Sequence, residues 1–296
     1  MKEAVETHVH DGDTLVIEGF THLICFAAGH EIIRQKVQDL VVCRLTPDLI
    51  YDQMIAAGCV RKVVFSWAGN PGVGPLYGLR RAVEQGIPRS IEIEEYTHFG
   101  MVARFVAGAA KLPFMHLNTF WGSSIARENK RIRNITCPYT GRTFATVPAL
   151  NPDVAIIHVQ RVDQEGNAQI WGLMGVQREA AFASKKVIVV AEELVDSSVI
   201  RSDPNRTIIP GIIVEAVVIE PFAAHPSYAQ GYYDRDNKFY VDWYKISKES
   251  KDMDEYITEW IYGVSGRKKY IEKLGAKKIR ELRADRRPSA PVNYGY

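Results

Sequence analysis

Short apolar runs alternate with longer amphipathic segments over most of the chain. The first run, residues 15–17, follows an Asp-Gly-Asp turn signal and has the length of a buried strand. Apolar residues at helical spacing follow it, and this pairing recurs along the chain. Strand patterns occupy residues 15–17, 40–43, 63–65, 91–96, 154–158, 187–190 and 212–219, and helical patterns occupy residues 29–35, 48–57, 79–85, 99–111 and 177–184. The alternation predicts an α/β fold with an open, mostly parallel sheet and helices on both faces.

The character of the chain changes near residue 241. Beyond it Lys, Glu and Asp are frequent, and apolar residues such as Tyr256 and Trp260 recur at helical spacing. We therefore expect an α/β domain over residues 1–240. Residues 241–296 are expected to form a helical C-terminal extension and tail, packed on that domain or on a partner subunit. Gly275 is expected to end the last helix of the extension.

The turn after the first strand is the strongest candidate for chemistry. The apolar run ends at Gly19 and Phe20, and the polar pair Thr21 and His22 follows. Ligands of open α/β sheets bind beyond the carboxyl ends of strands, and glycine lets a ligand approach the main chain closely. Such a turn can present backbone N–H groups to a developing negative charge, as an oxyanion hole does. From the spacing alone, a strand-to-helix turn whose glycine serves only geometry is the alternative.

A second candidate lies in the loop-rich middle of the chain. Hydroxyl groups and aromatic rings surround Gly122 in residues 118–124, which include Ser123 and Ser124. An aromatic pocket with polar tips suits a small acyl group. Capping of the next helix by Ser123 or Ser124 explains the same residues equally well.

Other titratable residues are better explained by structural roles. His158 follows a buried-strand pattern and is expected to be a hydrogen-bonded core histidine. Glu192 and Glu193 are neighbours after a strand, so their side chains face opposite sides, and both are expected to be structural. The pair His8 and His10 is better explained by solvent exposure than by metal binding.

The composition is that of an ordinary globular protein, with 46% hydrophobic and 24% charged residues among 296. A net charge of +2 gives no electrostatic reason to expect nucleic acid or a membrane surface as partner. The N-terminus lacks a signal-peptide core, and no apolar run is long enough to span a bilayer. The four cysteines have no Cys-x-x-Cys spacing, which favours free thiols in a reducing cytoplasm and no metal site.

The turn at Gly19 resembles the N-terminal signature of the type I coenzyme A transferases, which reads Asp/Asn-Gly, then apolar residues, then Gly-Gly-Phe. Glu18 replaces the first of the paired glycines, and residues 24–26 replace a later Gly-x-Pro. The likeness covers roughly residues 10–282 and is closest to the A-type subunit of glutaconate CoA-transferase. The further segments that carry it are residues 31–35, 112–114, 154–158, 170–172, 210–211, 224–227 and 273–276.

The resemblance implies a bacterial, cytoplasmic enzyme of acyl-CoA metabolism that needs a second chain. Type I CoA transferases use a nucleophilic glutamate in a Ser-Glu-Asn-Gly-like motif of their B-type half. That motif is missing here. The resemblance therefore implies the A-type subunit of a heterodimer or larger hetero-oligomer, with the glutamate supplied by a B-type CoA-transferase subunit.

The same resemblance gives roles to the candidate residues. Gly19 and Phe20 would form the catalytic backbone turn, and Glu18 is a weaker candidate nucleophile. Acyl-CoA and a free carboxylic acid would be the substrates, with coenzyme A as a substrate and no metal. A nucleotide redox cofactor is not expected, because no Gly-x-Gly-x-x-Gly fingerprint follows the first strand. The residues expected to bind substrate are Thr21, His22, Gly122, Ser123 and Ser124.

Two other functions stay open at this point. Relatives on the same scaffold include hydrolases that open a ring of a CoA-linked steroid fragment and decarboxylases of CoA esters. The ring-opening relatives carry an acidic residue near positions 96–100, where this chain has none. A small-molecule-binding regulatory subunit is the non-enzymatic alternative, although no DNA-binding helix pair is predicted. A dicarboxylate substrate would need a cation, for which the candidates are Arg34, Arg80, Arg104 and Arg127.

Overall fold

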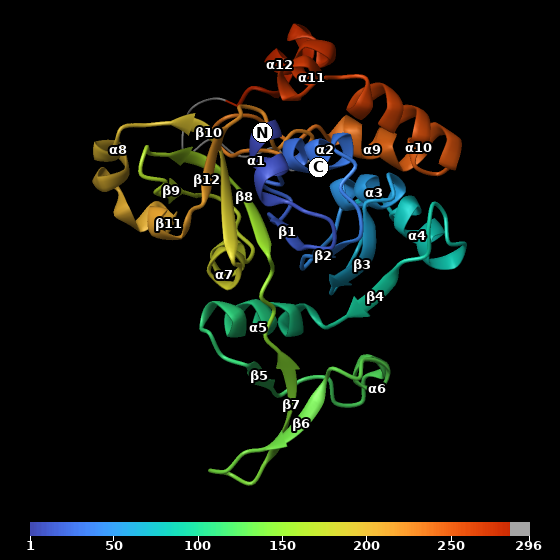
Figure 1. The fold of residues 1–296 in the computed structure, drawn as a ribbon, viewed down its shortest axis with the longest axis vertical. Coiled ribbons are helices and arrows are strands. Elements are labelled where there is room, and N and C mark those ends of the chain that lie inside the picture. Colours follow the sequence, from blue (N-terminus) through green and yellow to red (C-terminus); the bar gives the residue numbers. More distant parts are fainter. Residues whose placement is uncertain (285–296) are drawn as a thin grey trace.

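The structure, a computed structural model, describes residues 1–284, and nine strands of this part form one mostly parallel sheet (Figure 1). The predicted open α/β sheet is confirmed. Only β9 runs against the other strands of this sheet, and it pairs antiparallel with both β8 and β11. The strands are β1 (Thr14–Glu18), β2 (Leu40–Cys43), β3 (Val60–Phe65), β4 (Glu92–Glu95), β8 (Val154–Val162), β9 (Ala168–Gln169), β10 (Lys186–Leu194), β11 (Thr207–Ile209) and β12 (Ala216–Ile219).

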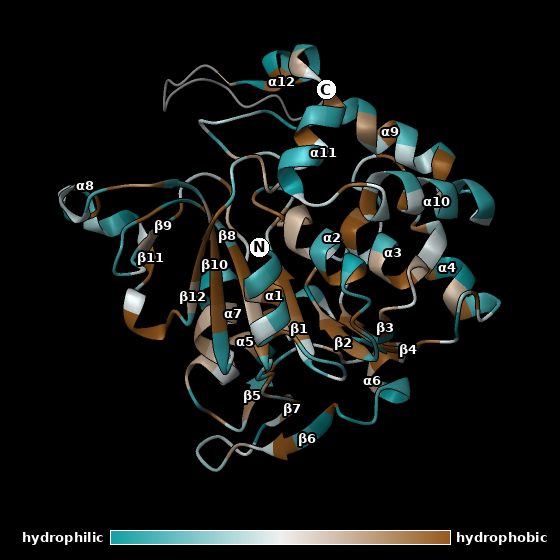
Figure 2. Ribbon diagram, turned by 45° about the horizontal axis from the view of Figure 1, so that its top comes forward, coloured by the Kyte–Doolittle hydropathy of each residue, from teal (hydrophilic) through white to brown (hydrophobic). Residues whose placement is uncertain are grey.

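Alternate residues of each central strand belong to two different cores. In β1, Leu15 and Ile17 pack into one apolar cluster, and Val16 packs into the other. Successive side chains of a strand point to opposite faces, so a strand covered on both faces is apolar throughout. The apolar character of β8 and β10 is visible in Figure 2. Helices must therefore cover both faces of the sheet, as predicted.

The helices divide between the two faces. Residues of α2 and α3 share one core with β1 and β2, and residues of α5 and α7 share the other. The helices of the first 240 residues are α1 (Lys2–His8), α2 (Phe26–Arg34), α3 (Leu49–Ala56), α4 (Tyr77–Glu84), α5 (His98–Ala109), α6 (Ser124–Glu128), α7 (Gln177–Ala183) and α8 (Ser197–Ser202), with 3-10 turns at Pro204–Arg206 and Gly211–Ile213. The last of these turns corrects the predicted strand over residues 212–219, which begins only at Ala216.

A small antiparallel sheet was not predicted from the sequence. It consists of β5 (Phe114–Leu117), β7 (Thr143–Pro148) and β6 (Arg133–Thr136), in that order. In Figure 1, α5 lies between this sheet and the main sheet. All four residues of β6 are exposed, so the alternation of apolar and polar residues that normally reveals a strand is missing there.

The C-terminal helices join the core of the main sheet. Tyr240, Trp243, Met253 and Ile257 belong to the same apolar cluster as the α2 side of β1. Gly275, at φ 87°, ends α11, but a further helix follows it directly. The helices are α9 (Asn237–Ile246), α10 (Ser250–Ile257), α11 (Arg267–Leu274) and α12 (Ala276–Leu282), with a π-helical turn at Thr258–Tyr262. The predicted tail from residue 285 lies outside the described residues.

Within residues 1–284, no helix is long and apolar enough to cross a membrane.

Candidate functional site

The register of β8 explains why the chain must bend at Gly19. β10 pairs with one edge of β8 along its whole length, from Val154 to Val162. The other edge is shared, because β1 pairs with its first half and β9 with its last residues. β1 and β9 run toward each other on this edge, so the turn after β1 lies where their ends meet.

The turn itself is tight enough to require glycine. A Cβ atom on Gly19 would lie 2.6 Å from the His22 carbonyl oxygen and 2.8 Å from that of Leu23, and both are backbone atoms. Thr21 and Leu23 adopt left-handed backbone conformations, with φ of 56° and 55°. Non-glycine residues rarely adopt this conformation, and such strain concentrates at functional sites.

Interior contacts hold this strained loop in place. Ser227 Oγ donates to the Thr21 carbonyl oxygen over 2.7 Å, and Leu23 N–H donates to the Tyr228 carbonyl over 2.9 Å. His22 is fully buried, and its Nε2 accepts from the Gln230 N–H over 3.0 Å. Its Nδ1 therefore carries the proton and donates to the Leu173 carbonyl over 2.8 Å. Burial lowers the pKa of His22 to about 4, so the ring is neutral.

The segment that follows β9 closes over the end of β1. The backbone N–H of Trp171 donates to the side-chain oxygen of Gln160 on β8. The chain then continues to Gly175. A Cβ atom on Gly175 would lie 2.9 Å from Glu18 Oε1 and 3.2 Å from the Phe20 Cβ. Gly175 therefore packs closely against the side chains of Glu18 and Phe20, and a larger residue there would have to displace them.

Free backbone donors line the turn. Among the described residues, none accepts a hydrogen bond from the N–H groups of Phe20, Thr21 or His22. Successive N–H groups next to a left-handed residue form concavities that bind anions. The turn is thus chemically suited to stabilise a negatively charged oxygen.

Charged groups are buried directly beneath the turn. Glu18 and Arg44 are both fully buried, and Arg44 forms an ion pair with Asp48 over 3.1 Å. The N–H groups of Gly19 and Val176 face the Glu18 carboxyl but do not reach hydrogen-bond geometry. Burial raises the pKa of Glu18 to about 7, although the nearby Arg44 charge lowers it.

Exposed apolar side chains surround the turn. The Phe20 ring lies 6.1 Å from that of His98, at the start of α5, and His98 Nδ1 is 3.0 Å from Ser66 Oγ. The segments that contact the turn or the first turn of α5 carry five exposed large apolar side chains, which we call the apolar rim. The apolar rim consists of Trp67, Phe99, Trp121, Leu173 and Met174.

The second predicted cluster also contacts the first turn of α5. Phe120 packs against Gly100 there, and Gly122 is exposed with a φ of 74°. Ser123 caps α6, because its side chain accepts from the Ile125 N–H over 3.1 Å. The capping alternative is therefore confirmed for Ser123. Its predicted substrate contact stays a prediction, as do those of Gly122 and Ser124.

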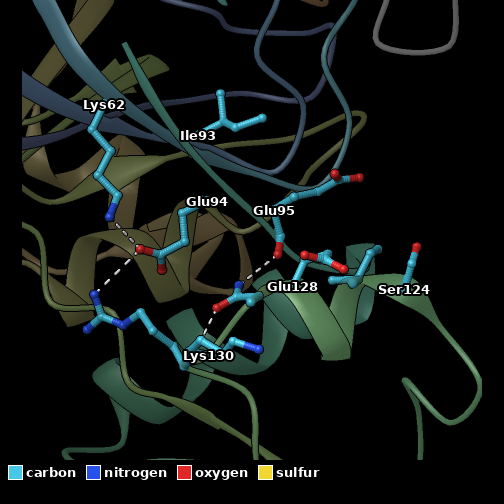
Figure 3. Close-up of a pocket in the computed structure, with 10 residues that line it drawn as sticks. Lys62, Ile93, Glu94, Glu95, Ser124, Glu128 and Lys130 are labelled. Carbon is cyan, nitrogen blue, oxygen red and sulfur yellow. Dashed lines mark hydrogen bonds and ion pairs between the residues drawn. The ribbon is translucent and has the colours of Figure 1, made fainter.

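Ser124 lines a pocket of about 400 Å³ between β4 and α6 (Figure 3). Glu94 lies at its inner wall, 2.7 Å from Lys62 Nζ and 2.9 Å from Arg104 Nη1. Burial raises the pKa of Glu94, but the bonds from Lys62, Tyr96 and Arg104 outweigh it and hold the pKa below its usual range. The residues of the Gly19 turn do not line this pocket.

A third polar group lies within the main sheet. His158 Nε2 is 2.8 Å from Glu192 Oε1, and the same oxygen accepts from the Tyr233 hydroxyl over 2.5 Å. Glu192 Oε2 accepts from the Phe222 N–H over 2.8 Å. These buried contacts agree with structural roles for His158 and Glu192. No group of three or more His, Cys, Asp or Glu side chains within residues 1–284 is arranged to hold a metal ion.

A sequence profile described as coenzyme A transferase matches residues 1–220. The chain belongs to the coenzyme A transferase family. It is 47% identical to the A-type subunit of 3-oxoadipate CoA-transferase from Pseudomonas knackmussii, and this alignment covers 94% of this chain and 98% of the relative. It is 32% identical to the A-type subunit of glutaconate CoA-transferase from Acidaminococcus fermentans, over 96% of this chain and 93% of the relative.

The fold comparison agrees with the sequence comparison. The crystal structure of glutaconate coenzyme A-transferase from Acidaminococcus fermentans superimposes with a TM-score of 0.91. The match covers 96% of this chain and 94% of that chain at 31% identity. The family and the CoA transferase role predicted from the sequence are confirmed by these matches.

The site also contains a residue that the sequence analysis missed. Arg44 follows β2 and is separated by 25 positions from Gly19, whose carbonyl oxygen it binds. Its signal in the sequence is only that of a charged residue after an apolar run. Contacts between neighbouring strands of this kind depend on register, which no local motif encodes.

Proposed function

We propose that this chain is the A-type subunit of a two-subunit CoA transferase, whose attacking glutamate belongs to a separate B-type subunit. The observation that carries the proposal is the Gly19–Phe20 turn, with its unpaired N–H groups at the carboxyl end of β1. The missing Ser-Glu-Asn-Gly motif and the similarity to proteins whose names mark them as A-type subunits support it further.

The chemistry divides between the two subunits. The glutamate of the B-type subunit attacks the thioester carbonyl, the carbon–sulfur bond breaks, and an acyl-glutamyl anhydride and CoA thiolate result. The thiolate then attacks the glutamyl carbonyl and releases the free acid as a carboxylate, which leaves CoA on the enzyme as a thioester. An acceptor carboxylate reverses these steps. In each addition the Phe20 N–H stabilises the oxygen that becomes negative.

The acid exchanged is proposed to be a dicarboxylic or 3-oxo dicarboxylic acid, because one relative is named a 3-oxoadipate CoA-transferase. The four arginines considered from the sequence already have carboxylate partners. Arg34 pairs with Glu31, and Arg104 pairs with Glu94. The other two pairs are Arg80 with Glu84 and Arg127 with Glu128. We propose that the B-type subunit supplies the cation for the second carboxylate.

Activity is expected only when both subunits are present. The purified chain alone should transfer no CoA, whereas the chain co-expressed with the product of the neighbouring reading frame should exchange CoA between an acyl-CoA and a free acid. The assay follows the acyl-CoA species by chromatography, with and without the acceptor acid. Transfer by the isolated chain would contradict the two-subunit proposal, and thioester hydrolysis without an acceptor would favour a hydrolase instead.

The apolar rim is proposed to be the contact surface for the B-type subunit. Phe99 is 60% exposed at the start of α5, and Ile212 is 93% exposed in the turn between β11 and β12. A charge in a buried apolar interface leaves an unpaired ion, so Phe99→Asp should weaken the association of the two chains at least about tenfold. Ile212→Asp is the matched control and should leave the dissociation constant unchanged. Equal effects of both variants would remove the rim from the interface.

A further inference from the structure

A buried guanidinium lies directly beneath the Gly19 turn. Arg44 Nη1 is 3.1 Å from Asp48 Oδ1, and the Cζ atom lies 5.6 Å from the centroid of the Tyr51 ring. The Nη2 of Arg44 donates to the carbonyl oxygen of Gly19. The ion pair and the ring fix the guanidinium plane, so a carbonyl bound to it is fixed as well.

The rigid peptide unit transmits this contact to the other side of the turn. The bond between Gly19 and Phe20 is trans, so its C=O and N–H point in opposite directions. The Gly19 carbonyl faces Arg44 in the interior, and the Phe20 N–H therefore faces away from Arg44. This N–H has no acceptor among residues 1–284. The orientation of the free donor is thus set by a residue on a neighbouring strand.

We propose that Arg44 is the positioning residue of this turn: by holding the Gly19 carbonyl, it directs the Phe20 N–H toward the thioester oxygen. The inference rests on the proposed function, which makes the turn an oxyanion site. Arg44 also lies near the departure from the family signature, because Glu18 stands in place of a glycine directly before the turn.

The chain offers a closely matched control for Arg44. Arg104 is also buried, forms an ion pair with Glu94 over 2.9 Å, and donates through Nε to the Pro148 carbonyl over 3.1 Å. Its guanidinium lies 4.5 Å from the centroid of the Tyr96 ring. Both arginines thus combine a carboxylate, a backbone carbonyl and an aromatic ring, but only Arg44 binds the turn.

The kinetic test compares Arg44→Lys with Arg104→Lys in complexes with the B-type subunit. Arg44→Lys should lower kcat about 10- to 100-fold with KM for the acyl-CoA changed less than about threefold, because the donor is misdirected while binding persists. Arg104→Lys should reduce the melting temperature but leave kcat within about twofold. Equal losses of kcat in the two variants, or none in Arg44→Lys, would overturn the proposal.

Should Arg44→Lys fail to fold, Asp48→Asn keeps the guanidinium and removes only its ion pair. This variant should lower kcat about three- to tenfold, again without a matching change in KM. Crystal structures of the variants give a readout that does not need activity: the Gly19–Phe20 peptide should rotate when Arg44 or Asp48 is changed and stay in place in Arg104→Lys. An unrotated peptide overturns the role of Arg44, whereas an inactive wild-type complex contradicts only the proposed function.

Discussion

Replacement of Gly19 by alanine is expected to lower the transferase activity of the assembled enzyme at least about hundredfold. The new Cβ atom would lie 2.6 Å from the His22 carbonyl oxygen and 2.8 Å from the Leu23 carbonyl oxygen. Neither atom belongs to a flexible side chain, so the turn must open to accept the methyl group. A shift of about 1 Å at a catalytic donor is enough for a loss of this size.

Gly263→Ala is the matched control for this variant. Its Cβ would lie 2.7 Å from the Glu259 carbonyl oxygen, a similar backbone clash, but in the turn after the last π-helical residues near the C-terminus. Both variants should lose stability, which thermal unfolding measures. Only Gly19→Ala should lose kcat when activity is normalised to the folded, assembled complex. Full activity of Gly19→Ala would show that the turn does not take part in catalysis.

Acidification is expected to destabilise the fold through His22 and His225. Burial is the main cause that lowers both pKa values to about 4, from 6.5 in the unfolded chain. Between these values the unfolded chain binds a proton that the folded state excludes. The contribution of these two histidines to the free energy of unfolding is therefore highest above pH 6.5 and falls as the pH drops toward 4. Each histidine contributes about 3 kcal/mol over the whole window.

Two buried acids act with the opposite sign. Burial raises the pKa of Glu18 to about 7 and that of Asp52 to about 6. The folded state keeps their protons where the unfolded chain has released them, so these groups stabilise the fold at low pH and lose that effect as the pH rises. The total stability therefore varies less with pH than any one group implies, and single variants are needed to separate the contributions.

The histidine contribution can be isolated with His225→Gln. His225 Nε2 is 3.2 Å from Asp236 Oδ2, and its Nδ1 is 3.0 Å from the Tyr270 hydroxyl. The variant should be less stable than the wild type near neutrality, because these contacts are lost. The difference in the free energy of unfolding between the wild type and this variant should shrink by about 2 kcal/mol between about pH 7 and about pH 5. Urea unfolding at each pH measures it. A stability difference between His225→Gln and the wild type that stays constant with pH would refute the assignment.

The main sheet was predictable because its pattern is local. Leu15 and Ile17 pack into one core and Val16 packs into the other. An apolar run of only a few residues therefore indicates a strand that is buried on both faces. In the small sheet, β6 has no such pattern because all its residues are exposed. A strand is recognised in a sequence by its pattern of apolar residues, and a fully exposed strand does not have such a pattern.

The sequence by itself determined the family, the two-faced sheet, and a glycine turn at the end of the first strand, because glycine spacing and apolar periodicity are written in consecutive residues. The tertiary structure decided what meets at that turn. β1 and β9 pair with the same edge of β8 and run toward each other, so their ends meet at the turn. Arg44 follows the neighbouring strand β2 and donates a hydrogen bond to the Gly19 carbonyl. Such contacts join distant positions through strand pairing, which short-range patterns do not specify.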